Sequence, residues 1–207
     1  MALRAETAAA TRQALLDAAA ALLDGGGIDT VTLREVGSGA GVSRSAAYRH
    51  FDNKEDLLMA LAAGAWSALV DRLRLIAADP DLDAEQALRA ALGALAQVAR
   101  SRPHLYRLMF APPTGDAAAA IEAATLAREV FLRVVGRVVG ERDAPAAAGL
   151  LMSTTHGVAD LELSGHLTAD KWGIDGDGII DLLVHTIRPA GEPAPTGPES
   201  AHPPHAR

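Results

Sequence analysis

The residue types best suited to chemistry in this sequence gather between positions 43 and 54. Arg44 can donate to a base edge or to a phosphate, and Tyr48, Arg49 and Lys54 are donors suited to phosphate oxygens. Three small residues stand beside them and would let the backbone come close to a ligand: Ser43, Ser45 and Ala46. This combination is typical of contact with nucleic acid.

The overall charge argues against such a contact. The chain has 19 Lys and Arg residues and 26 Asp and Glu residues, a formal net charge of -7, whereas non-specific DNA affinity comes mostly from cations that neutralise phosphates. The local charge differs: between Thr32 and Phe51 three arginines accompany one glutamate, and Lys54 follows. A nucleic-acid contact is therefore expected in this segment alone.

Two short helices are expected to position these residues. Thr32 and Glu35 have the spacing of a capping box, which predicts a helix through about Gly39. After a turn at residues 40–42, Ser43 is placed to cap another helix, which would run through His50 and end at Phe51 as an apolar plug. Two helices joined by a glycine-containing turn predict a helix-turn-helix, whose second helix enters the major groove.

Fixed residue types recur across this segment and the helices beside it. An apolar helical pattern from Leu15 to Leu23 stops at three glycines, and the later motifs read A-G-V-S, Y-R-H-F and K-E-D-L. From about Thr11 to Leu61 the chain resembles the TetR family of bacterial repressors. Gly37 and Gly39 stand where the family usually has alanine, at a cost of about 1 kcal/mol of helix stability each.

The resemblance also implies roles for single residues. Thr32, Tyr48 and Lys54 would hold phosphates, while His50 and Phe51 would be mostly structural. Three residues would face the bases: Arg44, Ser45 and Ala46. The alternative is a small helical bundle whose polar residues only face water, and Arg49 in particular could be a solvated charge.

The rest of the chain is also expected to be helical. Aromatic residues make up 3% of a chain that is 49% hydrophobic, so thin aliphatic side chains must build the core. Helices are expected at about 54–76, 83–101, 103–110, 116–139, 144–167 and 177–187. No segment is predicted to be a strand. The predicted fold is all-α: a three-helix DNA-binding domain at 1–53, a helical bundle for ligand binding and dimerisation at 54–188, and a disordered tail at 189–207.

The second domain carries a resemblance of its own. Residues 102–110 and 155–167 are similar to a TetR C-terminal subtype marked by Trp-His-Gly, with Thr155 in place of the tryptophan. The family resemblance implies a homodimer, in which Leu150–Leu167 and Ile179–Ile187 pair with the same helices of a second subunit. Three small residues would allow close approach: Gly149, Gly157 and Gly165.

The same resemblance implies a small-molecule effector bound between the helices of this domain. The candidate lining residues are Tyr106, Met109, Phe110, Phe131, Met152 and His156. The alternative is that all six belong to the core.

Two i, i+4 pairs, His156 with Asp160 and Glu162 with His166, could be metal ligands, but no third ligand converges on them and pairing along one helix is favoured. The D-G-D-G run from Asp175 resembles the start of a calcium loop but lacks the glutamate at the twelfth position. We interpret it as a turn and helix cap, and expect neither a metal nor a cofactor.

Several classes of protein are disfavoured. The absence of cysteine excludes disulfides, thiolate metal sites and cysteine nucleophiles, and neither a secretory signal nor an apolar run of about 18 residues is found, so a cytoplasmic location is expected. Catalytic motifs such as Gly-x-Ser-x-Gly and His-Glu-x-x-His are missing, which disfavours an enzyme. A helical module that binds only proteins is the other alternative.

The favoured hypothesis is a ligand-responsive repressor that binds double-stranded DNA as a homodimer. The operator would be roughly palindromic, with recognition helices about 34 to 36 Å apart, one turn of DNA. Ligand would act through its different affinity for two states of the protein.

Overall fold

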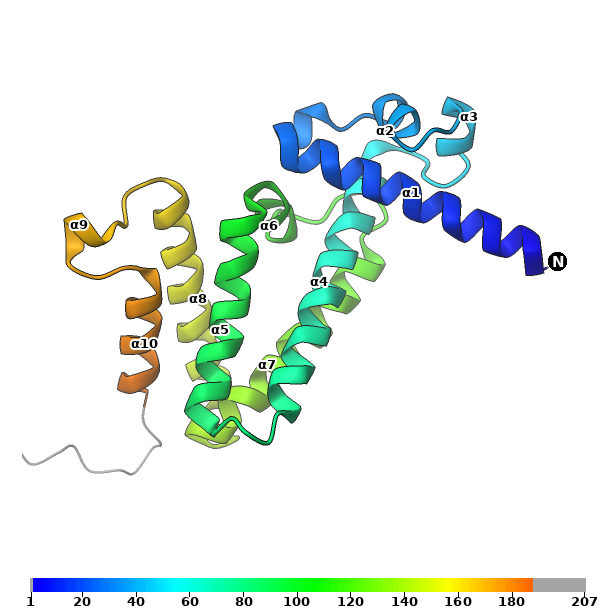
Figure 1. Ribbon diagram of the computed structural model, residues 1–207. Coiled ribbons are helices and arrows are strands. Elements are labelled where there is room, and N and C mark those ends of the chain that lie inside the picture. The colour runs from blue at the N-terminus through cyan, green and yellow to red at the C-terminus, as the bar shows by residue number, and fades with distance from the viewer. Residues whose placement is uncertain (1, 188–207) are drawn as a thin grey trace, which may run out of the picture.

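The computed structural model describes residues 2–187, and this part of the chain is helical without strands (Figure 1). The predicted all-α fold is confirmed. The predicted tail at 189–207 lies outside the described residues. The helices are α1 (Ala2–Gly26), α2 (Leu33–Gly39), α3 (Arg44–Ala47), α4 (Lys54–Ala78), α5 (Ala84–Ser101), α6 (Pro103–Met109), α7 (Ala118–Val139), α8 (Ala144–Leu163), α9 (Ala169–Trp172) and α10 (Gly176–Thr186), with a 3-10 turn at Ile28–Thr30 after α1.

The N-terminal module consists of α1, α2 and α3. Side-chain caps begin its two short helices, α2 and α3. The Thr32 hydroxyl accepts from the Glu35 amide at 3.2 Å, and the Ser43 hydroxyl accepts from the Ala46 amide at 3.2 Å. The Thr32 capping box is half formed within the described structure. The Glu35 side chain does not bond back to the Thr32 amide, because its carboxylate binds Arg34 at 2.7 Å instead.

The second helix of the module is shorter than predicted. α3 ends at Ala47 rather than at His50, and the chain continues as a tight turn in which the amides of Arg49 and His50 donate to carbonyls three positions back. Phe51 closes the turn and is only 4% exposed, so the predicted apolar plug is confirmed.

Two hydrophobic cores hold the molecule together. The first joins α1, α2 and α3 to the opening turns of α4 and to α6, through residues such as Leu15, Leu57 and Leu105. The second begins at Trp66 and fills the space between α4, α5, α7, α8 and α10. α4 belongs to both cores and packs along α7, while α8 and α10 form the side remote from α4 (Figure 1). The N-terminal module therefore packs against α4 and α6.

The remaining boundaries follow local capping signals. Asp83 and Gln86 form a complete capping box at α5, and Asp175 caps α10 by accepting from the Gly178 amide at 2.8 Å, as the turn-and-cap interpretation predicts. The β-branched run 134–139 is helical, also as predicted. α8 ends at Leu163, four residues before the predicted end, because Gly165 adopts a left-handed φ of 71° and the chain turns back. The short α9 that follows was not predicted.

Within residues 2–187 no helix combines the length and the apolar character that crossing a membrane requires.

Candidate nucleic-acid interface and effector cavity

α3, which carries part of the predicted DNA-contacting set, lies at one end of the molecule (Figure 1). Arg44, Ser45 and Tyr48 are exposed there, and the Arg44 guanidinium lies over the Tyr48 ring, 5.4 Å from its centroid. The Ser43 and Ser45 hydroxyls are 3.0 Å apart. The face is therefore a small polar surface with one cation held in place by an aromatic ring.

Two further predicted residues flank this face. Thr32 is exposed as the cap of α2, and Lys54 is the half-buried first residue of α4. Over residues 32–54, four cationic side chains outnumber two carboxylates although the chain as a whole is acidic. The local positive charge is thus concentrated on the helix-turn-helix.

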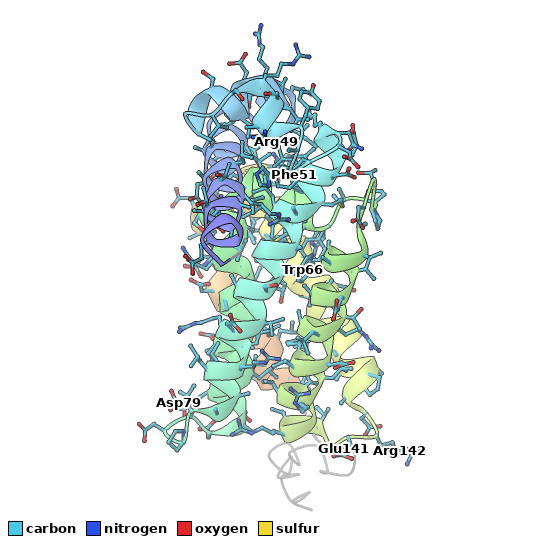
Figure 2. The ribbon with its side chains drawn as sticks, turned by 90° about the vertical axis from the view of Figure 1, so that its right-hand side faces the viewer. Arg49, Phe51, Trp66, Asp79, Glu141 and Arg142 are labelled. Atoms are coloured by element: carbon cyan, nitrogen blue, oxygen red, sulfur yellow. The ribbon has the colours of Figure 1, made fainter. Side chains whose placement is uncertain are left out.

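Ala46 and Arg49 are placed differently from the other predicted contacts. Ala46 is only 7% exposed, so it offers little side-chain surface to DNA. Arg49 borders a groove beneath the module, near Phe51 and the top of α4 (Figure 2). The guanidinium of Arg12 covers the Phe51 ring in the same groove, at 5.1 Å from the centroid.

An apolar cavity of about 70 Å³ lies between α4, α5, α7 and α8 in the second core. Two predicted ligand residues, Phe131 and Met152, line it, and Trp66 borders it between α4 and α7 (Figure 2). The other lining residues are Leu69, Leu73, Ala91, Leu92, Leu95, Ala124, Ala127 and Arg128. Arg128 is the one charged member of this lining.

A second cavity of about 70 Å³ lies nearer the module, between α4, α6 and α7. Met109, another predicted ligand residue, lines it, together with Met59, Leu108 and Ile121. Trp66 and Ala124 border both cavities. Trp66 was missed at the sequence level, where its position inside an apolar helix gave no sign that two cavities meet there.

The other three predicted ligand residues form an aromatic cluster beside these cavities. The Tyr106 hydroxyl and Nδ1 of His156 are 2.6 Å apart. Phe110 packs on both, with ring centroids at 4.9 Å from Tyr106 and 4.7 Å from His156, and edge-on to Trp66 at 5.3 Å. Burial, aided by the negative charge of Asp160, raises the pKa of Tyr106 to about 12. The cluster thus joins α6 and α8 to the wall shared by the two cavities.

The predicted pairing along α8 is wrong. Glu162 forms a two-bond ion pair with Arg100 of α5, at 2.8 and 2.9 Å, rather than meeting His166. His166 instead lies 3.1 Å from the Ser164 carbonyl, and His156 pairs with Tyr106 rather than Asp160. Arg100 also reaches Asp177 at 2.8 Å, and these partners, Glu162 first, raise its pKa. For Glu162 and His156, packing between helices supplies the partner in place of the residue four positions along the chain.

Comparison with known proteins supports this arrangement. The family model described as bacterial regulatory proteins, tetR family, matches residues 15–61, and a model described as tetracyclin repressor-like, C-terminal domain, matches residues 88–187. No curated protein matches the chain.

Several solved structures share the fold. A protein of unknown function from Rhodococcus sp. RHA1 is 29% identical, with a TM-score of 0.72 over 85% of this chain and 92% of its own. The transcriptional regulator FadR from Bacillus subtilis, in complex with stearoyl-CoA, is 14% identical with a TM-score of 0.65 over 84% and 95%. A TetR family protein from Vibrio parahaemolyticus is 19% identical with a TM-score of 0.60 over 84% and 97%.

Proposed function

Because the chain belongs to the TetR family of DNA-binding transcription regulators, we propose that it is a repressor that binds a roughly palindromic operator as a homodimer and releases it when a small molecule binds. The observation that carries the proposal is the exposed outer face of α3, with Arg44 held over Tyr48. A small exposed helix face with a guanidinium suits base-edge contact in the major groove.

The proposed contacts combine the exposure of these side chains with the roles that the family resemblance implies. Ser43, Arg44 and Ser45 would face bases, and Thr32, Tyr48 and Lys54 would hold phosphates. Ala46 and Arg49 stay in the proposed set with smaller roles, since Ala46 is buried and Arg49 borders the groove beneath the module. The division at residue 53 between a DNA-binding domain and an effector domain is part of this proposal, as is a cytoplasmic location.

The first experiment is selection of DNA from a random pool by the purified protein, followed by titration of the best site at several salt concentrations. We expect a palindromic consensus and a logarithm of affinity that falls linearly with the logarithm of salt. Failure to enrich any sequence, even at low salt, would refute the regulator proposal.

A variant set then tests the interface. Replacing Arg44, Tyr48 and Lys54 together by alanine should abolish operator binding, and a single good base contact is worth about 1–3 kcal/mol. Arg142→Ala is the matched control, because Arg142 is an exposed arginine at the opposite end of the molecule (Figure 2). If the triple variant still binds the operator, this module does not contain the DNA-binding site.

The proposed dimer interface lies on α8 and α10. Leu150, Leu161 and Leu182 are 56%, 46% and 58% exposed and give these two helices an apolar outer surface. A Cβ added at Gly149 or Gly157 would meet no atom within 4 Å, so both positions leave room for a second helix. Sedimentation should show a dimer that Leu150→Glu with Leu182→Glu dissociates, whereas Leu75→Glu on α4, a 67% exposed leucine, should not.

The proposed effector site combines the two cavities with the aromatic cluster beside them. FadR from Bacillus subtilis was crystallised with stearoyl-CoA, which supports a search for small-molecule effectors here. The narrower assignment to the Trp-His-Gly subtype remains part of the proposal and rests on His156 and Gly157. The family is one of transcription regulators rather than enzymes, so no catalytic activity is proposed.

A further inference from the structure

The two apolar cavities lie end to end along α4 and α7, with Trp66 as their common wall. One contains Ala127, Arg128 and Phe131 of α7, and the other contains Ala120 and Ile121 of the same helix. Arg128 and Ala120 are eight positions apart on α7, which is roughly 12 Å along the helix. The space is therefore long and narrow rather than round.

The chemistry of the lining selects a mostly apolar ligand. Ten of the eleven residues around the first cavity carry no charge, and the second cavity is lined by uncharged residues throughout. A cavity lined in this way offers water few hydrogen-bonding partners, so filling it with hydrocarbon is favourable. A polar molecule would not fit this lining, and a compact polycyclic molecule would not fit this shape.

Arg128 supplies the exception at the border of the first cavity. It is exposed, and it forms no ion pair with any carboxylate in the described part of the chain. An unpaired guanidinium beside an apolar space favours an anionic group and disfavours a cationic one.

We propose that the two cavities form one site for an unbranched aliphatic carboxylic acid, with its carboxylate on Arg128 and its chain running past Trp66 into the second cavity. This inference rests on the proposed function in one respect, that the site is the effector site. Because Trp66 lines both cavities, a ligand that fills both contacts its ring. Because Phe110 packs edge-on against that ring at 5.3 Å, the chain of the ligand would be sensed at α6.

Trp66 also provides the measurement. The chain has two tryptophans, and Trp172→Phe removes the other one, which is 66% exposed. We would titrate full-length Trp172→Phe protein with saturated fatty acids of increasing length, and with the alcohols and alkylammonium ions of the same lengths. Saturable change in Trp66 fluorescence is expected, with affinity rising by up to about fourfold per methylene until the cavities are full, and with the acid bound most tightly.

Two variants test where the carboxylate of the ligand binds and where its chain passes between the cavities. Arg128→Gln should weaken the acid by about tenfold, as expected for the loss of one charge-assisted hydrogen bond, and leave the alcohol unchanged. Arg133→Gln, an exposed arginine five positions along the same helix, is the matched control. Ala124→Leu narrows the passage at the wall shared by both cavities, and should weaken long chains more than short ones. Circular dichroism would confirm that each variant is folded.

The outcomes separate this inference from the proposed function. If no fatty acid binds saturably, if alkylammonium ions bind as well as acids, or if Arg128→Gln has no effect, the inference is overturned even when operator binding is intact. If fatty acids bind as described but no DNA is enriched, the ligand site stands and the repressor proposal fails.

Discussion

Thr155 is a buried polar residue whose hydroxyl has no hydrogen-bond partner within the described structure. Burying a hydroxyl without a partner costs about 1–3 kcal/mol. Thr155→Val keeps the shape and removes the hydroxyl, so it should raise the free energy of unfolding by about 1 kcal/mol. Urea denaturation of the two proteins measures the difference.

Thr155→Ser is the complementary variant, because it keeps the hydroxyl and removes a methyl group. It should lower the free energy of unfolding by about 1 kcal/mol through the small cavity it leaves. A valine variant less stable than the wild-type protein would mean that the hydroxyl is hydrogen-bonded in solution.

Tyr106 predicts a pH dependence. Burial raises the pKa of its hydroxyl to about 12, whereas an unfolded tyrosine titrates near 10. The folded state therefore holds the proton more tightly, and this contribution to stability is full below about pH 10 and is lost as the pH rises toward 12. Tyr106→Phe should show a smaller loss of stability over that window.

The measurement for Tyr106 is thermal unfolding at a series of alkaline pH values. The phenolate absorbance of a Tyr48→Phe background isolates Tyr106, because the chain has two tyrosines. A phenolate signal half developed near pH 10 in the folded protein would contradict the burial argument.

At the scale of the element, α2 is weakened by its own glycines. A Cβ added at Gly37 would meet its nearest neighbour, the Val42 carbonyl, at 3.5 Å, which is ordinary contact. Its backbone is helical, so Gly37→Ala should stabilise the module by about 0.4–1 kcal/mol. The midpoint of thermal unfolding should rise accordingly.

Gly39→Ala is the matched comparison on the same helix. There the added Cβ would lie 3.2 Å from Cβ of Ala18 on α1, so α1 would have to give way. We expect Gly39→Ala to gain less stability than Gly37→Ala. Equal gains would show that α1 and α2 adjust freely against each other.

At the scale of the whole molecule, an ion pair joins the N-terminal module to the helical bundle that follows it. Arg102, between α5 and α6, binds Asp24 near the end of α1 at 2.8 Å. Both side chains are more than a third exposed, so the pair is worth at most about 1 kcal/mol. Arg102→Ala should leave operator affinity nearly intact, but reduce by up to about fivefold the factor by which effector changes that affinity.

Arg74→Ala is the control for this coupling, because its ion pair with Asp71 lies within α4 and does not join α4 to another helix. Operator titrations with and without effector give the coupling factor for each variant. An unchanged factor in Arg102→Ala would assign the communication to the apolar contacts of α6 with α1 instead.

The sequence by itself determined the features that depend on near neighbours in the chain. The caps at Thr32, Ser43 and Asp83 join a side chain to an amide three positions on, so spacing alone predicts them. The all-α fold and the helix-turn-helix follow from the same local periodicity and from motifs at fixed spacing.

Tertiary structure alone decided the rest, because packing joins residues that the chain keeps far apart. Glu162 pairs with Arg100, 62 positions away, through two hydrogen bonds to one planar guanidinium, while His166 lies beyond the end of α8 at Leu163. Trp66 and Arg128 come from different helices, and no local pattern shows that they border one apolar space. Which predicted ligand residues line a cavity and which form the aromatic cluster depends on how α4, α6, α7 and α8 pack together.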